Sequence, residues 1–236
     1  HRRYGTPYIC YLQQPTRFLY QREIDKTAGW GYDLNMKVLD VLISKIGLSA
    51  VRKLDLKSIL GAETVLTNSR WIAEWVRKAY GCEAYPCPPG VDTERFKPTN
   101  NGDKMLREKY GVATPFVLTT CRNVPQKKID WLILALEKIL KELHGVNLVV
   151  AGTTTAHTSE LQRLAKKVGV EDHVKFLGEV PGRDLTLLYS RADVYAFPPP
   201  QEDFGLGPIE AMACGTPTVA WNFAGPKETV VDGVTG

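Results

Sequence analysis

Apolar segments of six or seven residues alternate with helix-like segments through the second half of this 236-residue chain. Strands that are apolar throughout, separated by helices, are typical of a parallel sheet that is covered on both faces. The pattern therefore predicts an α/β fold, a doubly wound parallel sheet of the Rossmann-like type. The expected strands are 116–122, 147–152, 173–178, 193–198 and 216–221, and the expected helices are 128–143, 158–168, 182–191 and 207–214.

The first half has a less regular pattern. Residues 34–47 carry apolar residues at helical spacing, and residues 63–67 have the character of a short buried strand. We expect Ser69 to cap the start of a second helix, which Gly81 ends. The stretch YPCPPGVDTERFKP has the strongest cluster of Pro and Gly in the chain. The predicted organisation is a first domain at 1–88, a linker at 89–98 and a second domain at 99–236.

Charge is unevenly distributed between the two halves. Residues 1–110 carry a formal charge of +6, and residues 111–236 one of −2. A solvated basic surface is the simpler interpretation, and contact with an anionic membrane face or a phosphorylated acceptor is the alternative. The basic residues are not interleaved with aromatic ones on one element, and the isoelectric point is only 8.7, so nucleic-acid binding is not expected.

The number of cysteines and the lengths of the apolar runs indicate the cellular compartment of the protein. The five cysteines are odd in number and lack zinc-site spacing, which favours a reduced, cytoplasmic protein. No apolar run approaches the roughly 20 residues of a membrane span, and the apolar stretch in HRRYGTPYICYL is too short for a signal peptide. We expect a cytoplasmic protein, with peripheral contact at the inner membrane face as the option that the basic first half leaves open.

The carboxyl ends of the predicted strands carry the polar motifs. Ligands bind at these ends in open parallel sheets, so segments that are distant in sequence meet in one crevice. The segments expected there are 122–128, 152–155, 178–180 and 198–210.

The last of these segments opens a short helix. Pro208 suits the first position of that helix, where its missing N–H costs nothing. Backbone N–H groups near Gly205, Leu206 and Gly207 would then be free to donate to phosphate oxygens at the positive helix end. We place Glu210 three residues into the helix, near this phosphate end.

Two carboxylates flank this helix start. A carboxylate near phosphate is better suited to accepting hydrogen bonds from sugar hydroxyls, which is the role we expect for Glu210 and, for a second sugar ring, Glu202. The alternatives are a capping-box role for Glu210 and a solvated loop acid at Glu202.

The segment CRNVPQKKID supplies positive charge. Arg122 directly follows a predicted strand, and Lys127 and Lys128 open the next helix, where cations oppose the helix dipole. This unfavourable placement indicates an anionic ligand, although a solvated basic turn is the alternative. Fixed cations beside a diphosphate would stabilise the charge that develops when a sugar leaves it, without a metal. The chain has no Asp-x-Asp, no Walker loop and no G-x-G-x-x-G.

Taken together, EDFGLGPIEAMACGTP, CRNVPQKK, PPGVDTERFKP and FLGEVPGRDLTLLYSRADVYAFPP resemble the GT-B retaining glycosyltransferases of family 4. A shorter stretch, YICYLQQPTRFLY, resembles the mannosyltransferase branch of that family, with Gln13 where the branch has His and with Arg17 present. The resemblance runs from about residue 60 to the end, and it implies the C-terminal GT-B domain with an incomplete N-terminal domain before it.

The resemblance also implies roles for individual residues. Glu210 would bind the ribose hydroxyls, Glu202 the transferred sugar, and Arg122 and Lys127 the leaving diphosphate. It implies a metal-independent, retaining transfer of a sugar from a nucleotide-diphosphate sugar to a glycan or lipid-linked acceptor, with no further cofactor. The resemblance to the mannosyltransferase branch favours GDP-mannose as the donor. Backbone donors to sugar and phosphate would be Phe204, Gly205 and Leu206, and the residues near the base would be Gly178, Glu179 and Val180.

Some positions depart from the family pattern. Lys128 and Asp203 stand where Gly is usual, and we expect Asp203 to point outward. Residues 152–155 lack the usual glycine-rich turn. A nucleotide-sugar epimerase and a non-catalytic nucleotide-sugar-binding module on the same fold are the alternative functions.

Overall fold

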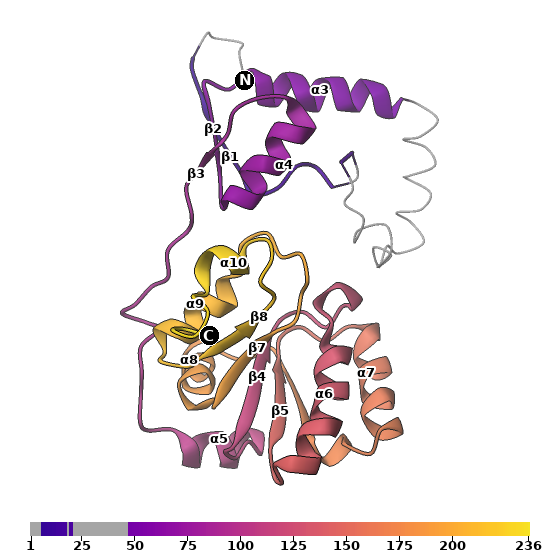
Figure 1. The fold of residues 1–236 in the computed structure, drawn as a ribbon, viewed down its shortest axis with the longest axis vertical. Helices are drawn as coiled ribbons and strands as arrows, with labels where there is room; N and C mark the ends of the chain where they lie inside the picture. The colour runs from indigo at the N-terminus through magenta and orange to yellow at the C-terminus, as the bar shows by residue number, and fades with distance from the viewer. Residues whose placement is uncertain (1–5, 18, 21–46) are drawn as a thin grey trace. The chain divides into compact units, whose positions relative to one another are not determined.

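The computed structural model describes residues 6–17, 19–20 and 47–236 (Figure 1). The chain forms two compact units, residues 1–89 and 90–236. The predicted helix at 34–47 lies outside the described residues, apart from its closing Gly47. Within the described residues, no helix is both long enough and apolar enough to cross a membrane.

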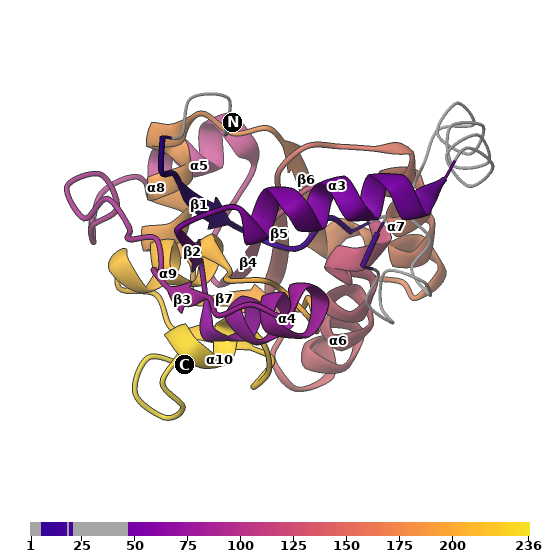
Figure 2. The same ribbon diagram turned by 90° about the horizontal axis from the view of Figure 1, so that it is seen from above.

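The first unit contains a small parallel sheet in the order β1-β2-β3. Its strands are β1 (Ile9–Leu12), β2 (Thr64–Thr67) and β3 (Tyr85–Pro86), and its helices are α3 (Leu48–Leu60) and α4 (Arg70–Tyr80), seen from above in Figure 2. The predicted strand at 63–67 and the helix after it are confirmed. The Ser69 hydroxyl accepts the Ile72 N–H at 3.1 Å, and Gly81 ends α4 in the left-handed region at φ 68°.

The second unit is built on a five-stranded parallel sheet in the order β6-β5-β4-β7-β8. The chain adds β5 and β6 on one side of β4 and then returns to place β7 and β8 on the other side. The order therefore reverses between β4 and β7, and such a switch point opens a crevice at the carboxyl ends of the strands. The strands are β4 (Phe116–Thr120), β5 (Asn147–Ala151), β6 (Val174–Gly178), β7 (Val194–Phe197) and β8 (Thr218–Ala220).

Helices cover both faces of this sheet. Leu148 of β5 belongs to a buried cluster with Ile133 of α6 and Leu161 of α7, whereas the next residue, Val149, belongs to a second cluster with Leu188 of α8. This alternation follows from the two-residue period of a strand and gives a three-layer domain. Its helices are α5 (Asp103–Tyr110), α6 (Ile129–Glu142), α7 (Ala156–Lys167), α8 (Gly182–Arg191), α9 (Leu206–Ala213) and α10 (Pro226–Thr229), with short 3-10 turns η2 (Pro125–Lys127) and η3 (Glu171–His173).

Candidate functional site

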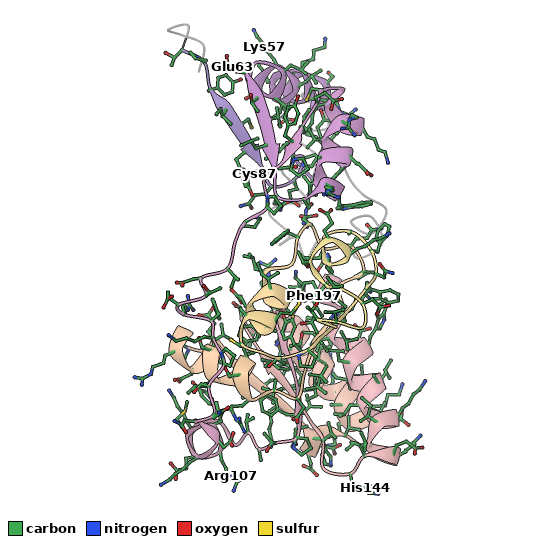
Figure 3. All side chains as sticks on the ribbon, turned by 60° about the vertical axis from the view of Figure 1, so that its left-hand side comes forward. Lys57, Glu63, Cys87, Arg107, His144 and Phe197 are labelled. Atoms are coloured by element: carbon green, nitrogen blue, oxygen red, sulfur yellow. The ribbon has the colours of Figure 1, made fainter. Side chains whose placement is uncertain are left out.

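The predicted polar motifs meet where β4 and β7 end. Figure 3 shows Phe197, the last residue of β7, at the opposite end of the second unit from Arg107 and His144. Thr120 ends β4, and its hydroxyl bonds the Tyr195 hydroxyl of β7 at 2.8 Å. This end of the sheet therefore joins the loop after β4 to the segment that carries the two glutamates.

An ion pair connects those two loops. The Lys127 ammonium donates to Glu202 Oε2 at 2.5 Å, and the two side chains are 26% and 23% exposed. The same ammonium lies 5.9 Å from the Phe197 ring centroid. Beside the pair, burial raises the pKa of the Cys121 thiol to about 11, so this thiol is neutral at physiological pH. Glu202 is therefore not the solvated loop acid that the sequence left open.

The backbone turns sharply to present Lys127. Residues 125–127 form η2, and Lys128 then adopts φ 54° in the left-handed region before α6 begins. This conformation favours glycine. The Gly that is usual here in the related pattern would adopt this turn without strain, whereas this chain adopts it with lysine.

The second glutamate lies in a network of hydroxyl groups. The Tyr189 hydroxyl donates to Glu210 Oε2 at 2.8 Å, and Thr120 links Tyr189 at 2.7 Å to Tyr195 at 2.8 Å. Burial raises the pKa of the Glu210 carboxyl above its usual value, against the opposing effects of the Tyr189 hydrogen bond and the Arg95 charge. Burial also raises the pKa of both tyrosines, which keeps them as hydroxyl donors.

Helix α9 differs from the prediction at its start. It begins at Leu206 with Gly205 at the cap, so Pro208 is the third helical residue and not the first, and Glu210 is the fifth. Gly205 has φ 87°, a conformation that lets the chain enter the helix two residues before Pro208. The capping residue Gly205 has no side chain, and Glu210 lies beyond the third helical position, so the capping-box role considered for Glu210 is wrong.

The prediction for Asp203 is also wrong. Its side chain does not point out to solvent, because Asp203 is buried with 9% exposure. The backbone of this segment packs closely on the loop after β8, where the Gly225 N–H donates to the Glu202 carbonyl at 2.9 Å. A Cβ at Gly225 would lie 2.6 Å from the Asp203 carbonyl oxygen. The loop after β7 and the loop after β8 thus pack against each other and bury Asp203.

The remaining strand-end loops are joined by side-chain hydrogen bonds. Thr153 donates to Glu179 Oε1 at 2.9 Å, which connects the loop after β5 to the loop after β6. Thr155 caps α7 through a capping box with Thr158, so α7 starts at residue 156, two residues earlier than predicted. Val180 packs against the core cluster that contains Tyr189.

The structure thus brings the predicted residues to one end of the sheet, some in direct contact and others only through intervening groups. Lys127 contacts Glu202 directly, and Glu210 is joined to the same strand ends through hydroxyl groups. Arg122 lies two residues after the end of β4 and is exposed, and Leu206 is 51% exposed at the start of α9. The sequence did not identify Tyr189, because a tyrosine inside an amphipathic helix has the signal of an ordinary core residue.

Among the described residues, no cluster of three His, Cys, Asp or Glu side chains could hold a metal.

Comparison with known proteins identifies the family. Residues 105–236, which include every strand of the five-stranded sheet, match the family model of the glycosyl transferases group 1. The chain belongs to this family. The match spans the ion pair, α9 and Glu210, so the site described above lies inside the group 1 glycosyl transferase region. The predicted family and α/β fold class are therefore confirmed.

Individual relatives agree with this assignment. The chain is 36% identical over 185 residues to a GDP-mannose-dependent alpha-(1-6)-phosphatidylinositol monomannoside mannosyltransferase of Mycolicibacterium smegmatis, covering 74% of this chain and 48% of the relative. It is 35% identical to a D-inositol 3-phosphate glycosyltransferase of Xylanimonas cellulosilytica, covering 75% of this chain and 45% of the relative. The structure of Anabaena HepE in complex with UDP-glucose matches with TM-score 0.72 and 26% identity, over 98% of this chain and 57% of that one. The chain thus spans about half the length of these relatives.

Proposed function

We propose that this chain is the nucleotide-sugar-binding part of a hexosyltransferase. The enzyme moves a sugar, by our inference mannose, from a nucleotide-diphosphate sugar to a glycan or lipid-linked acceptor. The observation that carries the proposal is the meeting of Lys127, Glu202 and the Glu210 network at the switch point of a doubly wound sheet. This arrangement supplies a cation for phosphate and two carboxylates for hydroxyl groups.

The diphosphate is the part of the donor that needs positive charge. In the proposed complex, Lys127 leaves Glu202 and donates to a phosphate oxygen, and the exposed guanidinium of Arg122 adds a second, planar set of donors. The N–H groups at the start of α9, from Gly205 and Leu206, complete the cradle, with the Phe204 N–H beside them. When the bond from the sugar to the diphosphate breaks, these groups stabilise the growing negative charge, and no metal is required.

The carboxylates hold the two sugar rings. Glu210 is oriented by the Tyr189 hydroxyl and accepts hydrogen bonds from the ribose hydroxyls, while Glu202, released from Lys127, accepts them from the transferred hexose. The loop at 178–180, tied to the β5 loop through Glu179, lies near the base. We infer transfer with retention of configuration from the family resemblance.

Donor and acceptor classes are inferred from the relatives. The Mycolicibacterium smegmatis relative is named for GDP-mannose and a phosphatidylinositol monomannoside, and the Xylanimonas cellulosilytica relative for D-inositol 3-phosphate. GDP-mannose is therefore the proposed donor, and a lipid-linked or phosphorylated polyol or glycan the proposed acceptor. The basic first half would suit peripheral contact with an anionic membrane face.

Titration calorimetry tests the donor assignment. GDP-mannose, UDP-glucose and ADP-glucose are each titrated into the chain, and we expect GDP-mannose to bind most tightly. Incubation of the full-length protein with the preferred donor alone then separates transferase from epimerase, because an epimerase changes the configuration of the donor sugar without an acceptor, whereas a transferase needs an acceptor to take the sugar. If none of the three donors binds, the proposal is wrong.

The raised pKa of Glu210 predicts an unusual pH dependence. The affinity for GDP-mannose should fall as pH decreases, with a midpoint above the value of about 4.3 for an ordinary glutamate, because a protonated Glu210 is a weaker acceptor for ribose hydroxyls. Arg95 is the charged group that acts on its pKa, and the nearby Tyr189 and Tyr195 hydroxyls stay neutral throughout this range. Calorimetry between pH 4 and pH 8 measures the effect, and GDP-mannose suits the titration because its diphosphate diester keeps a constant charge.

Glu210→Gln is the control for this dependence. The variant keeps the shape of the side chain but cannot titrate, so its weakened affinity should be nearly flat across the same range. A wild-type profile that matches the variant's would show that another group is responsible.

A further inference from the structure

Two aromatic side chains form an exposed patch beside the site, and we call Trp131 and Trp221 the aromatic patch. Trp131 lies in the first turn of α6, and Trp221 directly follows β8. Their ring centroids are 5.6 Å apart with an interplanar angle of 66°, an edge-to-face arrangement. The two residues are 39% and 48% exposed. Large aromatic side chains that remain this exposed together mark a surface for binding.

The patch is fixed in position by polar contacts. The Trp221 indole N–H donates to the Pro198 carbonyl at 2.8 Å, and the Lys128 ammonium lies 5.4 Å from the Trp131 ring centroid. These contacts hold the two indoles before any ligand arrives, so little conformational entropy is lost on binding. The Lys128 ammonium also gives the patch a polar border, as is usual for a binding surface.

The patch is directly connected to the loop that carries Glu202. Pro198, which accepts from Trp221, precedes that loop, and the Gly225 N–H just after the patch donates to the Glu202 carbonyl at 2.9 Å. Lys128 on the other side is the neighbour of Lys127, the partner of Glu202. The aromatic patch therefore borders the sugar end of the candidate site, next to the two loops that supply the ion pair.

We propose that the aromatic patch binds a hexopyranose ring. The inference rests on the proposed function and names a chemical class for the ligand next to Glu202. The C–H groups on one face of a pyranose carry partial positive charge and pack against the negative face of an aromatic ring, while its hydroxyls remain free for polar neighbours such as Lys128. Aliphatic chains gain nothing from this polarity, and a fixed indole pair with a charged border fits a small amphipathic ring better than a lipid tail.

Two sources supply such a ring: the hexose of the donor and a sugar of the acceptor. Calorimetry with GDP and GDP-mannose reports on the first source, because only GDP-mannose carries the hexose. Saturation-transfer NMR with methyl α-D-mannopyranoside, recorded on the chain saturated with GDP, reports on the second. Each measurement is made on the wild type, on Trp221→Ala and on Trp221→Phe.

A loss of at least fivefold in one of these two affinities is expected for Trp221→Ala, with GDP affinity unchanged and substantial recovery in Trp221→Phe. Leu143→Ala is the matched control, because Leu143 is 62% exposed at the opposite end of α6 and its truncation should change neither affinity. The unchanged affinity for GDP shows that the variant is folded. Trp131→Ala provides a second test from the other side of the pair.

The possible failures are distinguishable. If wild-type chain binds none of the nucleotides, the proposed function itself is wrong. If GDP binds normally but Trp221→Ala alters neither the GDP-mannose affinity nor the methyl mannoside signal, only the patch inference is overturned. Sedimentation with phosphatidylglycerol vesicles is the last measurement. Vesicle binding that depends on Trp221, without saccharide binding, would also overturn the patch inference and would favour a lipid surface as the ligand.

Discussion

Replacing Lys127 with alanine should slow sugar transfer by the full-length protein about 10²- to 10³-fold, the usual loss when one donor to a developing negative charge is removed. The physical reason is that Lys127 is the half-buried cation at the carboxyl end of β4, held at 2.5 Å from Glu202 where the diphosphate would replace that carboxylate. Affinity for GDP should fall as well, but by less than the rate, because the charge on the leaving group grows in the transition state. Initial rates with GDP-mannose and calorimetry with GDP measure the two effects.

Lys141→Ala is the matched control for this experiment. Lys141 also pairs with a glutamate, Glu137 at 3.2 Å, but on the exposed surface of α6, so the same change in net charge should leave rate and affinity unaltered. Equal effects of the two substitutions would mean that Lys127 acts only through overall charge, and the assigned role would be wrong.

The substitution Glu202→Gln should separate nucleotide binding from transfer. In the free site, Glu202 neutralises Lys127, so a nucleotide must displace a carboxylate to reach the ammonium. Removing the negative charge while keeping the shape should tighten GDP binding about threefold to tenfold, which corresponds to an ion pair of roughly 1 kcal/mol. Transfer from GDP-mannose should nevertheless fall, by about 10²-fold on the scale of a lost charged contact to the reacting sugar.

Calorimetry with GDP and rate measurements on the full-length protein check the two directions. Glu137→Gln is the control, since it removes one negative charge from an exposed pair on α6 and should change neither quantity. Weaker GDP binding in Glu202→Gln would show that the carboxylate does not compete with the nucleotide for Lys127.

The five strands of the second unit could be predicted because burial leaves a local signal. All five are rich in apolar residues, and the residues of β4 and β5 alternate between two buried clusters. Helices α3 and α5 were not predicted, since they bury little. Leu54 and Leu60 of α3 are 69% and 51% exposed, and Leu106 is the buried residue of α5, so neither sequence has a clear apolar stripe.

The candidate site was predictable in its residue types but not in its pairings. Lys127 and Glu202 were each identified from their strand-end positions, yet no local pattern encodes a contact between residues 75 positions apart. The buried Asp203 was misplaced for the same reason, because the loop that encloses it comes from beyond β8. Tyr189 orients Glu210, but nothing in the local sequence distinguishes a tyrosine with a functional hydroxyl from a tyrosine that only packs in the core.

A crystal structure of the chain with GDP-mannose tests the central claim most directly. The diphosphate oxygens should lie within hydrogen-bonding distance of Lys127 and the first N–H groups of α9, with ribose hydroxyls on Glu210 and the hexose on Glu202. A nucleotide bound elsewhere on the second unit, with the contact between Lys127 and Glu202 intact, would contradict it.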